Sequence, residues 1–454
     1  MPFQWRIKQL GSILAGRGVE RCLVVASACP SAQATVDLVR DSLRKTSISF
    51  IQRQMADNQW PTADFVDGMA RDVRDDGGQA VVGVGADGVL DAAKATSLLA
   101  YVQQGGTPSS AEQFLGHGPD GAAPTCSRLP MVAVVTRPTL ASASGRCLLW
   151  HDGQLVPLRI AGTGSHLGIG PGLPPTVAIV DQLALGFRRG GSRSVGPMEE
   201  QSNLCVGASA LAAIVDMRLA TAGTIKALML EEAAATGVTS IRSVLADPMH
   251  CAVDGLLATQ VAAIACLDSD ATAYGKVSTI HALACAAVGS LPPSEARPAG
   301  CVPYSSLCCA FLPAVLRAVA ANGSEAEQHA MTSLASTLLW RPRDATATED
   351  DSTAPAATAL DLARYLEGRY AELRMPSVRQ LLLGRASTNV DGVQDGGGGG
   401  ARAEGERYLA NLISISVWNH ALVRRNGARQ LPLWFDDIDD VMAVVRRAVD
   451  DNEH

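Results

Sequence analysis

The sequence predicts two domains, an α/β domain with a mainly parallel sheet followed by an all-α domain. The chain has 454 residues, which exceeds the usual size of a single hydrophobic core. In its first part, short apolar runs rich in β-branched residues alternate with segments of helical periodicity, as in βαβ units. After residue 197 strand-like runs cease, and long Ala- and Leu-rich segments replace them. We therefore predict a Rossmann-like α/β domain over residues 1–195 and a helical domain over residues 196–454.

The α/β assignment depends on five apolar runs and three helical segments. The predicted strands are 22–26, 48–51, 81–84, 131–135 and 177–180. The predicted helices are 32–44, 65–74 and a helix that follows a glycine turn and continues through 94–103. Because helical segments separate the strands, the connections are crossovers and the sheet is mainly parallel.

The helical domain is predicted from nine segments bounded by Gly, Pro or Asp. They are 203–221, 224–237, 248–267, 273–289, 304–321, 327–340, 356–372, 406–424 and 436–450. Two stretches interrupt them, a polar and acidic one near 343–355 and a glycine-rich one near 391–406. Neither has the apolar residues that packing requires, so we predict flexible insertions at both places.

Composition and charge indicate a well-buried globular protein. Apolar residues make up 47% of the chain, charged residues 18% and aromatic residues 4%, so Ala, Val and Leu build most of the core. The net charge of −7 gives no basis for binding nucleic acid or an anionic membrane. No apolar run reaches the roughly 18 residues that a membrane span needs. We expect a homo-oligomer or another protein as the partner, and neither nucleic acid nor a membrane span.

The cysteines and the N-terminal segment bear on the compartment. Eleven cysteines without a Cys-x-x-Cys pair are typical of free thiols in a reducing compartment. Residues 1–19 carry Arg6, Lys8 and Arg17 and no acidic residue, which suits an organellar presequence. The same segment also suits the opening of the fold, since its apolar residues lead directly into the first strand. We expect an intracellular protein, cytoplasmic or mitochondrial.

The stretch from Val81 to Lys94 is the strongest candidate for a binding site in the first domain. A predicted strand is followed by a turn that contains Gly85 and Gly88, and then by a predicted helix. Glycine lets the backbone approach a ligand closely, and a helix N-terminus offers free N–H groups to a phosphate. An ordinary strand-to-helix turn has the same pattern, so the sequence leaves both interpretations open.

Three motifs in order resemble one family. Gly85-Ala-Asp-Gly-Val-Leu-Asp-Ala-Ala-Lys94 and Pro138-Thr-Leu-Ala-Ser-Ala-Ser-Gly-Arg146 are the first two. The third combines Ile280-His-Ala-Leu-Ala-Cys285 with Cys309-Ala-Phe-Leu-Pro313. Together they resemble the iron-containing alcohol dehydrogenase family, which has a dehydroquinate synthase-like fold. The opening strand and turn are most similar to the maleylacetate reductase branch.

The resemblance implies a dinucleotide-binding domain, a helical domain and NAD or NADP as the cofactor. The residues that it assigns to the cofactor are Gly85, Gly88, Asp91, Lys94, Thr139 and Arg146. Asp87 departs from the family pattern, because it places a carboxylate where a pyrophosphate would approach. Asp87 is also suited to cap the following helix. Ser27 stands where many members carry an Asp for the ribose, and it would not exclude NADP.

The metal site of the family does not carry over. The resemblance implies one Asp and three His as ligands, and the corresponding residues here are Ser209, Ala213, His281 and Tyr304. One ligand of four remains, which argues against a bound catalytic metal. His281 and Cys285 are four residues apart on a predicted helix and could form a different site with Asp216. A histidine beside a small buried cysteine in the core explains the same pattern, as it does for the Cys308-Cys309 pair.

Two hypotheses about function follow from these residues. The first is a divergent relative that has lost most metal ligands and serves as a non-catalytic structural or binding subunit. The second is a metal-independent NAD(P)-dependent oxidoreductase that reduces a carbonyl, with His281 and Tyr304 as the predicted catalytic residues. In the second hypothesis Arg146 could also polarise the carbonyl, and Lys94 and Thr139 would hold the cofactor.

Overall fold

The computed structural model divides the chain into two compact units. It describes residues 7–56, 59–104, 110–115, 128–136, 147–152, 154–158, 176–179, 181, 197–223, 238, 241–246, 279–289, 304–339, 357–383, 409–411, 413–415, 417, 424–425, 428–429 and 438–450. The first unit is Met1–Ser194 with Leu267–Asp270 and Leu291–Tyr304. The second unit is Val195–Cys266, Ala271–Ser290 and Ser305–His454.

The first unit is built around a parallel sheet of five strands, which confirms the predicted fold class. The strands lie in the order β2–β1–β3–β4–β7, and all four strand pairs are parallel. Their bounds are β1 (Arg21–Ser27), β2 (Ser49–Met55), β3 (Ala80–Gly85), β4 (Met131–Val135) and β7 (Val177–Ile179). Every residue of β3 and β4 is buried, as expected for central strands that are covered on both faces.

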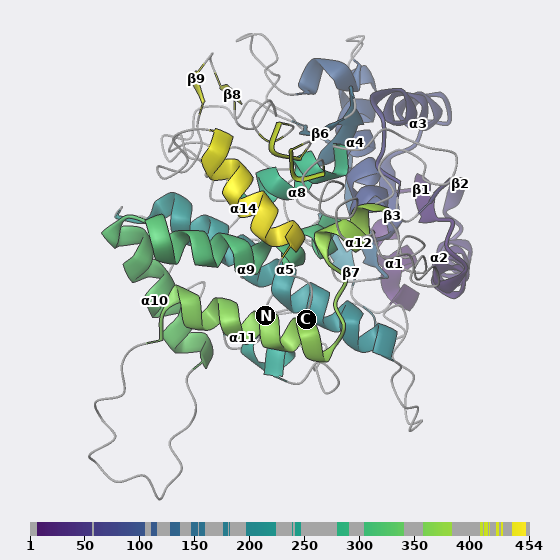
Figure 1. Ribbon diagram of the computed structural model, residues 1–454. Helices are drawn as coiled ribbons and strands as arrows, with labels where there is room; N and C mark the ends of the chain where they lie inside the picture. The colour runs from purple at the N-terminus through teal and green to yellow at the C-terminus, as the bar shows by residue number, and fades with distance from the viewer. Residues whose placement is uncertain are drawn as a thin grey trace, which may run out of the picture. The chain divides into compact units, whose positions relative to one another are not determined.

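Helices cover both faces of this sheet (Figure 1). Alternate strand residues such as Leu23 and Val81 pack in one apolar cluster with residues of α3 (Ala63–Asp75) and α4 (Asp87–Gln104). The intervening residues, such as Val24 and Val82, pack in a second cluster with η1 (Ile7–Gln9), α1 (Leu10–Ala15) and α2 (Gln33–Lys45). The apolar residues of segment 7–15 therefore pack in the core of the unit, as expected for a segment that belongs to the fold.

Two hairpins were not predicted. β5 (Leu148–His151) pairs antiparallel with β6 (Gln154–Pro157), and β8 (Arg424–Arg425) pairs antiparallel with β9 (Ala428–Arg429). The prediction of a helix over 406–424 is therefore wrong at its end. Asp-Gly and Asn-Gly dipeptides, at 152–153 and 426–427, separate the paired strands. These dipeptides are typical of two-residue hairpin turns, but the flanking strands are too short to show an alternating pattern.

The described part of the second unit is mainly helical. Its helices are α5 (Pro197–Thr221), α8 (Thr279–Gly289), α9 (Tyr304–Asn322), α10 (Glu325–Leu339), α11 (Ala359–Glu372), α12 (Val378–Leu383) and α14 (Ile438–Asp450). Tyr304 itself is grouped with the first unit. The short helix α12 was not predicted. The predicted helices 224–237 and 248–267 and both predicted insertions, 343–355 and 391–406, lie outside the described residues.

Helix α9 combines high apolar content with a core position. Among the described residues it alone is long and apolar enough to cross a membrane, although no apolar run of this length was expected. Yet 67% of its most apolar 18-residue window is buried inside the protein. The side chains of Leu307, Phe311 and Leu312 are completely buried, so α9 packs as a core helix.

Candidate functional site

The glycine turn between β3 and α4 is packed tightly against the chain's own atoms. β3 ends at Gly85 and α4 begins at Asp87. A Cβ atom on Gly88 would lie 2.3 Å from the carbonyl oxygen of Gln59, and one on Gly85 would lie 2.8 Å from Cγ1 of Val89. These two glycines therefore allow other atoms to come close to the turn, and the atoms that do so are those of Gln59 and Val89.

Asp87 opens α4 in an unusual backbone conformation. Its φ angle is 33°, in the left-handed region that non-glycine residues rarely adopt. The residue is 8% exposed and is an acidic group in the first turn of the helix. A carboxylate at this end of a helix is stabilised by the helix dipole. Asp87 therefore places its charge at the favourable end of the α4 dipole.

Asp91 and Lys94 form a buried ion pair on α4. The Lys94 ammonium donates to Oδ1 of Asp91 over 3.0 Å, and the two side chains are 0% and 3% exposed. Oδ2 of Asp91 accepts the backbone N–H of Leu148 over 3.0 Å. The thiol of Cys147 donates to the Asp91 carbonyl over 3.2 Å, so this cluster fastens α4 to the start of β5.

The environment of this cluster is dry. The pKa of the Cys147 thiol lies well above its ordinary value, first because of burial and then because of the nearby Asp91 carboxylate. In such surroundings an unpaired charge is costly, so Asp91 and Lys94 stabilise each other. The Lys94 side chain has no exposed surface in this arrangement.

The carboxyl end of the sheet gathers most of the predicted cofactor residues. Gly85, Gly88, Asp91 and Lys94 lie together at the β3–α4 junction, whereas Thr139 and Arg146 lie outside the described residues. Ser27 ends β1, and its hydroxyl accepts the backbone N–H of Cys29 over 3.0 Å. This end of a parallel sheet is where α/β domains bind their ligands.

The predicted metal positions hold side chains that do not fit a divalent metal. Ser209 and Ala213 are buried in α5, with exposures of 2% and 4%. A methyl group cannot coordinate a metal, and a neutral hydroxyl is a poor substitute for a carboxylate. Tyr304 is the first residue of α9 and is 6% exposed, and the side chain of His281 lies outside the described residues.

In the alternative site around Cys285, the Asp216 carboxylate already accepts a backbone hydrogen bond. Oδ1 of Asp216 accepts the backbone N–H of Ile280 over 2.9 Å, and so caps the first turn of α8. Cys285 is completely buried. Within the described residues, no three His, Cys, Asp or Glu side chains gather in a way that could hold a metal ion. Cys308 and Cys309 are also buried, which confirms their predicted place in the core.

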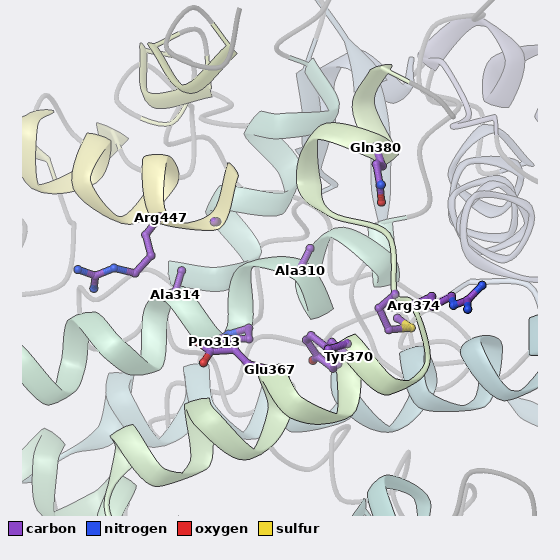
Figure 2. Close-up of a pocket in the computed structure, with 11 residues that line it drawn as sticks. Ala310, Pro313, Ala314, Glu367, Tyr370, Arg374, Gln380 and Arg447 are labelled. Atoms are coloured by element: carbon purple, nitrogen blue, oxygen red, sulfur yellow. The ribbon is translucent and has the colours of Figure 1, made fainter. Parts of the chain in front are cut away.

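The second unit contains a cavity of about 170 Å³ that the sequence did not predict (Figure 2). Its lining comes from α9, α11, α12, α14 and the residues after α11. Arg374 and Arg447 extend to opposite sides of the view in Figure 2. Glu367 forms a bidentate ion pair with Arg317, with N–O distances of 2.6 and 2.5 Å. No sequence pattern links these residues, because they come from helices far apart in the chain.

Tyr370 is the unusual polar group beside this cavity. Its residue is 7% exposed, and among the described residues its hydroxyl has no hydrogen-bond partner. Burial raises the pKa of this hydroxyl well above its ordinary value, and the thiols of Cys309 and Cys205 raise it further. The hydroxyl therefore stays protonated at neutral pH.

Comparison with known proteins shows similarity to one family. Residues 3–182 match the family model of the iron-containing alcohol dehydrogenases. The five-stranded parallel sheet followed by a mostly helical region is the fold of that class. No curated protein matches the chain in sequence.

Solved structures of the class are similar to the chain over nearly its whole length. The iron-containing alcohol dehydrogenase from Thermococcus thioreducens is 15% identical, with a TM-score of 0.65, over 98% of this chain and 96% of that one. The NADH-dependent butanol dehydrogenase A from Thermotoga maritima is 15% identical, with a TM-score of 0.62, over 97% and 94%. Sulfoacetaldehyde reductase from Bifidobacterium kashiwanohense in complex with NAD+ is 14% identical, with a TM-score of 0.58, over 98% and 96%. The TM-scores show a common fold.

Proposed function

We propose that the whole chain is a divergent member of the iron-containing alcohol dehydrogenase family that serves as a non-catalytic structural or binding subunit. The donor set on α5 carries this proposal. Ser209 and Ala213 stand one helical turn apart at buried positions where the family resemblance implies two metal ligands. A metal that polarises a carbonyl or an alkoxide needs several ligands and an open coordination position.

The cofactor loop supports the same proposal. The charged groups of Asp91 and Lys94 are buried against each other and against the N–H of Leu148. The close approach that Gly88 permits is made by the Gln59 carbonyl. Asp91 and Lys94, which match the family pattern, therefore have a role in holding this unit together.

A second candidate function is a metal-independent NAD(P)-dependent oxidoreductase that reduces a carbonyl, similar to maleylacetate reductase. The strand–turn–helix geometry at the carboxyl end of β3 favours it. The fold is shared with an NADH-dependent dehydrogenase and with a reductase solved with NAD+. In this function His281 and Tyr304 would be the acid groups, and Thr139 and Arg146 would complete the cofactor site.

Nucleotide and metal titration of the purified full chain separates the two functions. We expect NADH and NADPH at millimolar concentration to shift the melting temperature by less than about 1 °C, since a ligand that does not bind cannot stabilise the fold. Added Fe²⁺ or Zn²⁺ should produce no alcohol-dependent reduction of NAD or NADP. The same titration on an active family member is the positive control.

The opposite outcome has a clear signature. Carbonyl-dependent loss of NADPH or NADH absorbance would overturn the subunit proposal and support the reductase. In that case Tyr304→Phe and His281→Ala should each lower kcat by at least about tenfold, whereas the exposed control Arg44→Met should leave kcat unchanged. Under the subunit proposal, size-exclusion chromatography with light scattering should show either a homo-oligomer or a complex with a protein partner.

A further inference from the structure

Two cysteines from separate helices meet in the core of the second unit. Cys205 lies in α5 and Cys309 lies in α9. The Cys309 thiol donates to the backbone carbonyl oxygen of Cys205 over 3.1 Å. Sγ of Cys205 lies 3.7 Å from Oγ of Ser306, which is one helical turn before Cys309. Each thiol therefore lies against the other cysteine's helix.

The two thiols differ in exposure. Cys309 is completely buried, whereas Cys205 is half-buried. Burial raises the pKa of Cys309 well above its ordinary value, and the neighbouring Cys205 side chain raises it further. Because Cys205 is the more exposed of the two, an oxidant from solution meets it first, and Cys309 is the neighbouring second thiol.

We propose that Cys205 and Cys309 form a reversible disulfide that joins α5 to α9 under oxidising conditions. Hydrogen peroxide is the oxidant class: the Cys205 sulfur attacks the peroxide, becomes a sulfenic acid and releases one water. The Cys309 sulfur then attacks that sulfenic sulfur, the S–S bond forms, and a second water leaves with the sulfenic oxygen and the Cys309 proton. Two thiols and one peroxide thus give one disulfide and two waters.

The Cys309 side chain reaches the backbone of the other helix, with its sulfur 3.1 Å from the Cys205 carbonyl oxygen. A disulfide requires Cα atoms about 4.4–6.8 Å apart, so formation of the bond brings the two helices to that separation and turns the two sulfurs toward each other. The closed loop would contain about 100 residues, which favours a large gain in stability over the reduced chain.

Peptide mapping of the full chain tests the proposal. The reduced protein is treated with hydrogen peroxide under native conditions, the remaining thiols are alkylated, and the digest is analysed by mass spectrometry. We expect a dithiothreitol-sensitive cross-link between the Cys205 and Cys309 peptides and a rise in melting temperature of at least about 4 °C. Cys205→Ser and Cys309→Ser should each abolish both signals.

Cys308→Ser is the matched control. Cys308 is adjacent to Cys309 and equally buried, but neighbouring residues on a helix point in different directions. This variant should keep the cross-link and the rise in melting temperature. A cross-link from Cys205 to Cys308 would overturn the proposal. So would full alkylation of Cys205 and Cys309 in the peroxide-treated wild type once it is unfolded in urea.

Discussion

Two buried polar clusters of this protein differ in how completely their groups are partnered. On α4, the Asp91 carboxylate receives both the Lys94 ammonium and the Leu148 N–H. In the second unit, the buried Tyr370 hydroxyl has no hydrogen-bond partner among the described residues, and the Cys205 and Cys309 thiols are near enough to raise its pKa.

The difference shows which cluster tolerates change. A charged pair in a dry environment is stable as a unit, but the loss of one member leaves an uncompensated charge. Removal of the neutral Tyr370 hydroxyl should cost little, because this oxygen makes no hydrogen bond with the described residues. The Asp91–Lys94 cluster therefore stabilises the local structure, while the region around Tyr370 tolerates changes such as the proposed thiol oxidation.

The largest expected effect is that of Lys94→Met. Removal of the ammonium leaves the buried Asp91 carboxylate without its charged partner, which should lower the free energy of unfolding by about 3–5 kcal/mol. Urea unfolding followed by circular dichroism measures this change. The control is Arg44→Met, which breaks the exposed pair with Asp41 at the same i, i+3 spacing. That change should cost less than about 1 kcal/mol. Equal costs for both variants would mean that the buried pair is not a structural cluster.

The next effect concerns the glycine turn of the same region. Gly88→Ala brings a methyl group against the Gln59 carbonyl, where an ideal Cβ would lie 2.3 Å from the oxygen. We expect a loss of about 1–3 kcal/mol in the same urea assay. Gly68→Ala in α3 is the matched control, because a Cβ there has no atom within 4 Å. It should stabilise the protein by about 0.5–1 kcal/mol through helix propensity. A neutral Gly88→Ala would show that the turn is not packed as described.

A smaller effect is expected at the start of α11, where Thr358 and Asp361 form a capping box. Thr358→Ala should cost about 1 kcal/mol. The backbone N–H and the hydroxyl of Thr358 hold the pKa of Asp361 below its ordinary value. Its contribution to stability is therefore complete above the unfolded-state pKa and is lost as the pH falls through the lower folded-state pKa. Asp361→Asn should flatten the pH dependence of urea unfolding in this acid range. An unchanged acid limb would contradict the prediction.

The smallest effect is that of Tyr370→Phe. The substitution removes a buried hydroxyl that makes no hydrogen bond with the described residues, so it should change stability by less than about 0.5 kcal/mol or increase it by up to about 1 kcal/mol. Thermal unfolding of the reduced protein measures it. A loss above about 1.5 kcal/mol would reveal a hydrogen bond to this hydroxyl and would make the two clusters alike.

The fold could be predicted because its signals are local. Runs such as 81–84 and 131–135 are apolar and β-branched, and the segments between them repeat at helical spacing. Such patterns extend over several residues and can be recognised without knowing which other segments pack against them. The two hairpins could not be predicted in the same way. Their strands have two to four residues, which is too short for an alternating pattern to be recognised even beside Asp-Gly and Asn-Gly turns.

The site could be predicted less well. The resemblance singled out Asp91 and Lys94 as cofactor residues, and their three-residue spacing on a helix allows a pair. The contact of Asp91 with the Leu148 N–H joins residues that are 57 positions apart, and no local pattern encodes it. The same holds for the contact between Cys205 and Cys309, which are 104 positions apart.

By itself, the sequence determined that the chain has a parallel α/β unit and a helical unit. Periodicity and residue type are properties of the chain alone, so no tertiary information was needed for this division. Only the tertiary structure decided that Asp91 and Lys94 are buried partners and that the buried Tyr370 hydroxyl has no hydrogen-bond partner among the residues that the structure describes. Burial and hydrogen bonding depend on which distant segments meet, because desolvation is set by the whole surroundings of a group.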